Sequence, residues 1–162
     1  MTTQYPREGG EFLTFKLGGK EYGIDVLRVQ EIRSYEQPTQ IADAKPHIKG
    51  VLRLRGVIAP IVDLRIKLGC QALYNDFTVV IVVNTMGRII GVVVDSVSDV
   101  VEINRDRIMP APEFGNAIDS NFVIGTSWVS VGEGKFSTEH TLTLIDIEGL
   151  LSSADMGLIA QT

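Results

Sequence analysis

Four aspartates that each close an apolar run are the residues of this chain best placed to do chemistry: Asp25, Asp63, Asp95 and Asp146. Brought together, their carboxylates could hold a divalent metal ion or act in acid–base catalysis. An aspartate at the end of a strand can instead cap the turn or helix that follows. An internal repeat, described below, would also divide the four residues between two units. We therefore interpret them as caps.

The histidines and the cysteine offer no second constellation. His47 and His140 stand in polar stretches without a cysteine or a paired histidine at ligand spacing, so surface positions are expected for both. Cys70 follows Gly69 in an expected loop, and no histidine accompanies it at a recognisable spacing. The GEGK stretch at 132–135 lacks the leading glycine of a phosphate-binding loop. The sequence thus predicts no catalytic, metal or cofactor-binding residue, and no cofactor.

A group of basic residues surrounds the middle of the first half of the chain and could suggest nucleic acid. The group consists of Lys45, Lys49, Arg53, Arg55, Arg65 and Lys67. It has no interleaved aromatic residues for base stacking, and the whole chain carries a formal net charge of −5. A solvated or partner-pairing surface is the stronger interpretation.

Arg53 and Arg55 lie two apart on an expected strand and would share one face. Their guanidinium groups could pair with carboxylates of a partner protein, or form ion pairs within the chain. The sequence does not decide between these roles.

The composition is that of a folded soluble domain, with 162 residues of which 44% are hydrophobic and 22% charged. We find no apolar run of the roughly 18 residues that a membrane span needs, and no secretory signal at the N-terminus. A single cysteine favours a reducing compartment. These features predict a cytoplasmic protein with no direct membrane insertion, and residues 1–10 are expected to form a flexible tail.

Short strands separated by turn residues must position these side chains. The strongest hairpin joins FTVVIVVN (77–84) to GRIIGVVVD (87–95), and both faces of its first strand are apolar. Another hairpin joins EFLTFKL (11–17) to EYGID (21–25), and 26–33 is either a short helix or an irregular continuation. Eight or more strands with little helix predict an all-β barrel or sandwich.

The remaining elements complete this picture. Pro60 within VIAPIVD (57–63) favours an edge strand or a bulge. The closing segment 148–160 places Leu150, Leu151, Ala154 and Leu158 on one helical stripe, so a C-terminal helix is expected.

A weak internal repeat divides the chain. The hairpin ending at Asp25 is similar to the one ending at Asp95, and 48–63 is similar to 123–146 apart from the polar insert GEGKFSTEH (132–140). Two related β units explain this pattern economically. The polar stretch 69–76 is the expected internal boundary.

Four segments, which together cover nearly the whole chain in order, resemble the CheW family of chemotaxis coupling proteins of the enterobacterial type. They are EFLTFKLGGKEYGIDVLRVQEI (11–32), IKGVLRLRGVIAPIVDLR (48–65), VVIVVNTMGRIIGVVVDSVSDV (79–100) and LTLIDIEGLL (142–151). The resemblance implies two SH3-like five-stranded β-barrels packed on a shared core, in one domain spanning 11–160 and followed by 161–162. An exchange of strands between the barrels is left open.

The resemblance also implies a function. Members are non-enzymatic adaptors that bridge the cytoplasmic tip of methyl-accepting chemotaxis receptors to the regulatory domain of the histidine kinase CheA. It implies that Arg55, Val79 and Val100 face the receptor, and that Val29, Glu31 and Ile32 face the kinase. This chain departs from the family in having Arg53 where an asparagine is usual, and in its long 132–140 insert.

Two other functions remain open from the residues alone, a small-molecule-binding β-barrel and an RNA-binding β-barrel. The adaptor function would place the protein in the cytoplasm, recruited to membrane-associated receptor arrays through its partners and not bound to nucleic acid.

Overall fold

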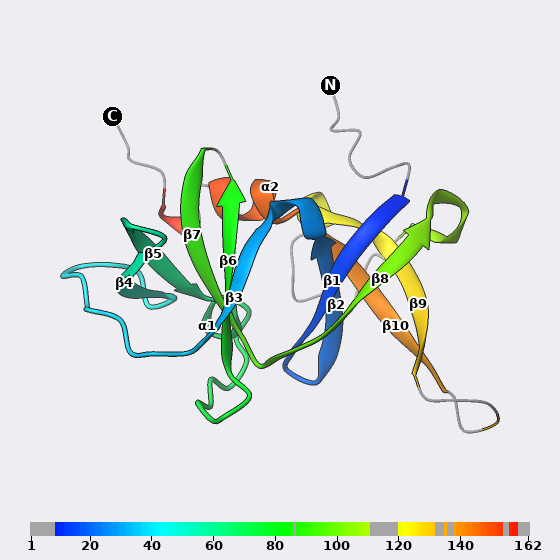
Figure 1. Ribbon diagram of the computed structural model, residues 1–162, viewed down its shortest axis with the longest axis horizontal. Helices are drawn as coiled ribbons and strands as arrows, with labels where there is room; N and C mark the ends of the chain where they lie inside the picture. Colours follow the sequence, from blue (N-terminus) through cyan, green and yellow to red (C-terminus); the bar gives the residue numbers. More distant parts are fainter. Residues whose placement is uncertain are drawn as a thin grey trace.

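The computed structural model describes residues 9–85, 87–110, 120–131, 135, 138–153 and 156–158. Its strands form two five-stranded sheets, each curved into a small barrel (Figure 1). The first barrel has the order β8-β1-β2-β10-β9, from Ser96–Asn104, Gly9–Leu17, Lys20–Asp25, Thr138–Ile145 and Val123–Val131. The second has the order β3-β6-β7-β5-β4, from Val29–Ser34, Val79–Thr85, Arg88–Val94, Val57–Asp63 and Ile48–Leu54. The predicted all-β fold of two five-stranded barrels is confirmed.

The two barrels have the same internal arrangement. In each, a hairpin (β1–β2 or β6–β7) pairs through its second strand with a parallel strand, β10 or β5. A glycine marks the parallel contact in both barrels, with Gly23 paired to Leu144 and Gly91 paired to Ile61. A Cβ on Gly91 would lie 2.6 Å from the Ile61 Cδ1 atom, so the absence of a side chain at Gly91 leaves the space that the Ile61 side chain fills.

The chain exchanges one strand between the barrels. After β2 it crosses through a 3₁₀ turn, Val26–Arg28, to place β3 at the edge of the second barrel. After β7 it crosses back and places β8 at the edge of the first barrel. Residues 69–76 connect the helix α1 (Leu64–Lys67) with β6 inside the second barrel, so the chain passes between the barrels at these two crossings and not at 69–76.

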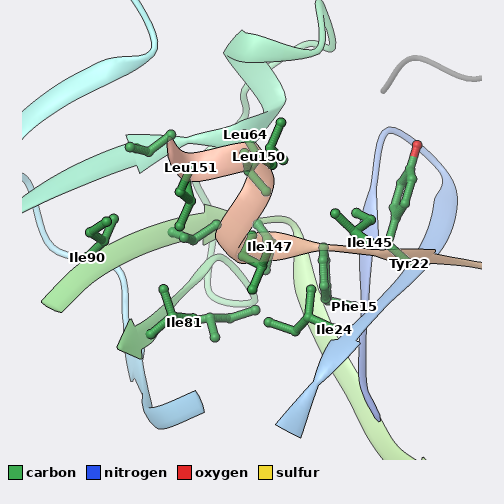
Figure 2. Packing of buried hydrophobic residues seen from close by; sticks show 14 of the residues in the cluster. Phe15, Tyr22, Ile24, Leu64, Ile81, Ile90, Ile145, Ile147, Leu150 and Leu151 are labelled. Atoms are coloured by element: carbon green, nitrogen blue, oxygen red, sulfur yellow. The ribbon is translucent and has the colours of Figure 1, made fainter. Parts of the chain in front are cut away.

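A shared core joins the barrels, and each barrel also has a smaller core of its own. The two apolar faces predicted for β6 account for this layering, because Ile81 and Val83 enter the shared core while Val80 and Val82 enter the core of the second barrel. The shared core also contains side chains from β1, β2 and the C-terminal helix α2 (Ile147–Ser152), as Figure 2 shows. Because apolar burial stabilises in proportion to its area, this shared layer holds the two barrels together.

The structure decides or corrects several local expectations. Of the two alternatives for residues 26–33, it has the irregular continuation, a 3₁₀ turn followed by strand β3. Residues 9–10 of the expected tail pair with β8 as part of β1, while residues 1–8 lie outside the described residues. Pro60 lies in an interior strand, but β7 pairs only with the residues that follow it, so the missing N–H interrupts no bond to that strand.

The predicted C-terminal helix is confirmed but is short. Leu150 and Leu151 are buried in it, Leu158 follows its end, and Ala154 lies outside the described residues. Among the helices of the described residues, none is long and apolar enough to span a membrane.

Candidate functional site: two exposed edge strands

Strand β3 presents the residues expected to face a kinase. It lies at the edge of the second barrel and pairs on one side with β6. Ile32 points outward with 44% of its surface exposed, whereas Val29 is half-buried against the shared core. The Glu31 carboxylate lies 3.5 Å from the guanidinium of Arg33 and 3.5 Å from that of Arg55. The strand therefore offers one apolar side chain beside a paired carboxylate.

Arg55 does not lie on a strand face, which corrects the expectation that it shares a face with Arg53. Strand β4 ends at Leu54, and Arg55 with Gly56 forms the two-residue turn to β5. Both turn residues have positive φ, 52° and 83°, which is the signature of a type I′ hairpin. An arginine in this conformation costs about 1–2 kcal/mol relative to glycine. The turn aims the Arg55 guanidinium at Glu31 and so closes the second barrel across its edge.

Strand β8 repeats the β3 arrangement on the first barrel. The register with the hairpin strands makes Val97, Asp99 and Val100 the counterparts of Val29, Glu31 and Ile32. The pairings that establish this are Ile32 with Ile81 and Val100 with Leu13, where Ile81 and Leu13 occupy matching hairpin positions. Both edge strands carry an irregularity at the same place, before Glu31 and before Asp99. Val100 and Ile32 also have the same exposed fraction, 44%.

The residues expected to face a receptor are not brought together as one group. Arg55 contacts Glu31, which belongs to the other expected set. Val79 begins β6, pairs with Ser34 and Val94, and is half-buried against the shared core. Val100 lies on the first barrel. The structure thus places one member of this set beside the β3 face, one next to the shared core, and one on the β8 face.

The interpretation of the four aspartates as caps is confirmed for three of them. Asp25 accepts a hydrogen bond from the Leu27 backbone N–H at 2.8 Å, and Asp63 accepts one from Arg65 at 3.0 Å. Asp146 begins helix α2 by accepting from the Gly149 N–H at 3.1 Å. Among the described residues no group of three histidine, cysteine or acidic side chains is arranged to hold a metal ion.

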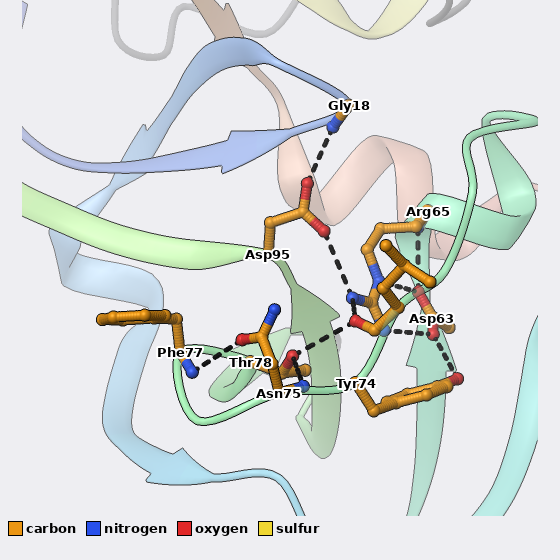
Figure 3. Close-up of polar contacts among 9 residues, drawn as sticks. Gly18, Asp63, Arg65, Tyr74, Asn75, Phe77, Thr78 and Asp95 are labelled. Carbon is orange, nitrogen blue, oxygen red and sulfur yellow. Dashed lines mark hydrogen bonds and ion pairs between the residues drawn. The ribbon is translucent and has the colours of Figure 1, made fainter.

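A buried ion pair that sequence reasoning missed lies beside this cap. Arg65 and Asp63 are fully buried, and the guanidinium Nε and Nη2 atoms donate to the two Asp63 oxygens at 2.9 and 3.0 Å (Figure 3). The Tyr74 hydroxyl donates to the same carboxylate at 2.8 Å, and Arg65 also stacks on the Tyr74 ring. The Asp63-Leu64-Arg65 spacing is the sequence signal for this ion pair, because the strand-to-helix turn holds the Asp63 and Arg65 side chains together.

These contacts explain how the two groups titrate. Burial lowers the pKa of Arg65, but the hydrogen bonds and charges of Asp63 and then Asp95 outweigh burial, so the net direction is upward and the guanidinium stays charged. Burial also raises the pKa of Tyr74, and its hydrogen bond to Asp63 raises it further. The cluster is a satisfied structural network, because its polar atoms are engaged with one another.

The histidines divide into one wrong and one partly correct expectation. His47 is buried, with its Nε2 atom 2.7 Å from the Met156 carbonyl oxygen, and is not a surface residue. Since a carbonyl only accepts, this nitrogen carries the proton. His140 is partly exposed and lies 3.1 Å from the Glu21 carboxylate. Both positions are explained by contacts with residues distant in sequence.

The fold and these two surfaces define the class: a protein of two SH3-like β-barrels with exposed edge strands. A family model described as a CheW-like domain matches residues 11–155. The chain therefore belongs to the CheW family of chemotaxis proteins.

Individual relatives agree. The chain is 49% identical over 152 residues to the chemotaxis protein CheW of Klebsiella aerogenes, covering 93% of this chain and 87% of the relative. It is 34% identical over 108 residues to CheW of Bacillus subtilis, covering 66% and 69% of the two chains. The crystal structure of the scaffolding protein TtCheW from Thermoanaerobacter tengcongensis superimposes with a TM-score of 0.76 at 25% identity, covering 94% of both chains. The predicted resemblance to enterobacterial CheW is confirmed.

Proposed function

We propose that this protein is a non-enzymatic adaptor that couples methyl-accepting chemoreceptors to the histidine kinase CheA. The observation that supports this most directly is the pair of matching edge strands, β3 and β8, on the two barrels that share one core. A protein with two preformed faces can contact two neighbours at once without covalent chemistry. It would act in the cytoplasm and join receptor arrays through its partners.

The β3 face is the proposed kinase side. Val29, Glu31 and Ile32 place an aliphatic side chain next to a charge that is already engaged by Arg33 and Arg55. An exposed aliphatic centre supplies affinity, and charges around it set the register of docking. The family resemblance also implies that the regulatory domain of the kinase has the same fold, so we expect a barrel edge of that domain to be the partner of the β3 face.

The β8 face is the proposed receptor side, with Val100 at its centre. The family resemblance assigns Val79 and Arg55 to the receptor as well. Val79 is half-buried, so it can contribute only a part of its side chain to a docking surface. Arg55 is 47% exposed in its side chain and can exchange its Glu31 partner for a partner carboxylate.

A matched pair of substitutions tests the two faces separately. Ile32→Asp and Val100→Asp change counterpart positions of equal exposure. We expect Ile32→Asp to weaken binding to the kinase regulatory domain at least about tenfold with receptor binding retained, and Val100→Asp to show the reverse. Leu73→Asp, at a 60% exposed loop position, serves as the control that alters surface charge elsewhere.

Calorimetric titration with each purified partner measures both affinities, and thermal unfolding shows that the variants remain folded. The proposal fails if both substitutions weaken the same partner, or if neither changes either affinity while all three variants stay folded.

A further inference from the structure

The second crossing between the barrels is held by polar contacts from both sides. The chain leaves β7 at Val94, turns at Asp95 and begins β8 at Ser96. Two groups of the first barrel bind Asp95. The Lys16 carbonyl accepts a hydrogen bond from the Asp95 N–H at 3.0 Å, and the Gly18 N–H donates to the Asp95 Oδ2 atom at 2.9 Å. From the second barrel, the Arg65 Nη1 atom donates to Asp95 Oδ1 at 3.2 Å (Figure 3).

Arg65 is itself immobilised within the second barrel. Its other nitrogens are occupied by Asp63, and Nη1 also donates to the Leu73 carbonyl at 2.6 Å. A fully buried guanidinium with this set of partners has a fixed position, because moving it would leave charges unpaired in the interior. The hydrogen bond from Arg65 therefore holds Asp95, the residue just before β8, in a fixed position relative to the second barrel.

The turn of the first barrel approaches the same place closely. A Cβ atom added to Gly18 would lie 2.6 Å from the Cys70 sulfur, which follows helix α1 of the second barrel. The crossing at Asp25 is different, since the Asp25 side chain accepts a hydrogen bond from Leu27, two residues along the chain. At Asp95, by contrast, directional contacts from both barrels meet on one residue.

We propose that Asp95, held by Arg65, is a positioning residue that fixes the angle between the two barrels. The shared core is apolar and sets how tightly the barrels pack, but apolar contact is non-directional and admits small rotations. The three hydrogen bonds that join Asp95 to both barrels are directional and do not allow such rotations. Asp95 thereby fixes where β8, with Asp99 and Val100, stands relative to β3.

Residual dipolar couplings on the isolated protein test this without any partner, so the outcome is independent of the proposed adaptor function. The couplings of each barrel are fitted separately for wild type, Asp95→Ala and the control Asp106→Asn. The control also removes one negative charge, at an exposed aspartate in the 3₁₀ turn Arg105–Arg107 that follows β8. In wild type and the control, the two alignment tensors should coincide.

In Asp95→Ala, each barrel should still fit its own structure, but the two tensors should no longer agree in orientation or magnitude. The Gly18 amide should also exchange with solvent about tenfold faster, as the loss of a charge-assisted bond implies. Coincident tensors in Asp95→Ala, together with faster Gly18 exchange, would overturn the proposal. If Asp95→Ala does not fold, Asp95→Asn, which keeps the shape and one acceptor oxygen, decides by the same criteria.

Discussion

Replacing Arg65 by methionine is the substitution whose effect on stability can be worked out most fully from the structure. Arg65 and Asp63 are both fully buried and are joined by two hydrogen bonds between their side chains. Methionine fills a similar volume but donates nothing. Asp63 would keep the Tyr74 hydroxyl and its cap to the backbone, and would lose its buried counter-charge.

Removing one partner of a buried ion pair costs about 3–5 kcal/mol, because the other charge is left uncompensated in the interior. A domain of this size has a total stability on the order of 5–15 kcal/mol, so the loss is a large fraction of it. At roughly 2–4 °C per kcal/mol for a chain of this length, we expect the Tm of Arg65→Met to fall by about 6–20 °C.

Urea unfolding followed by circular dichroism measures this loss, with unchanged m-values as the sign that the denatured state is the same. The double variant Asp63→Leu with Arg65→Met removes both charges, and we expect it to be less destabilised than either single variant. A loss below about 1 kcal/mol for Arg65→Met, or additive losses in the double variant, would refute the reasoning.

Three further outcomes are expected. Because the fold raises the pKa of Tyr74, its protonated form stabilises the protein up to about pH 10, and this contribution is lost as the pH rises further, so Tyr74→Phe should flatten the alkaline fall in Tm. Gly91→Ala should cost about 1–3 kcal/mol in urea unfolding because its Cβ would overlap Ile61. Gly23→Ala, at the matching site, has its nearest contact at 3.1 Å and should cost less. Arg55→Asn should leave Tm unchanged or raise it by about 2 °C, because asparagine tolerates positive φ.

Each of these has its own contrary result. An alkaline limb of the same steepness in Tyr74→Phe would mean that this hydroxyl does not titrate with the fold. Equal losses at Gly91 and Gly23 would contradict the difference in packing between the barrels. A Tm lowered by Arg55→Asn would show that the Glu31 ion pair outweighs the backbone strain of the turn.

Local patterns predicted the parts of this fold that depend on neighbours in sequence. The run 77–84 was apolar on both faces, and β6 is indeed covered on both sides by two cores. The sequence predicts Asp25, Asp63 and Asp146 as caps, and a cap is decided within three residues of its position.

The features that the sequence misses or leaves open depend on contacts between distant parts of the chain. His47 looked like a surface residue in a polar stretch, but its partner, Met156, lies 109 positions away. The exchange of β3 and β8 follows from pairing between strands of different hairpins, which no local periodicity encodes. The β-forming residues around Arg55 predict a strand there, whereas Gly56 and the register of the two strands make Arg55 a turn residue.

The roles of Arg55, Val79 and Val100 toward a receptor, and of Val29, Glu31 and Ile32 toward a kinase, came from family resemblance. Residue types alone could not supply them, because an exposed valine or isoleucine on an edge strand looks the same whatever binds it. The structure adds that Ile32 and Val100 are counterparts on two barrels.

Receptor-controlled kinase activity in a reconstituted mixture tests the adaptor function most directly. Purified kinase and receptor signalling domain are combined with wild-type protein, Ile32→Asp, Val100→Asp or no added protein, and autophosphorylation is followed with and without receptor ligand. We expect receptor control only with wild-type protein, and its loss in both variants. Receptor control that persists without this protein, or that survives in both variants, would contradict the account.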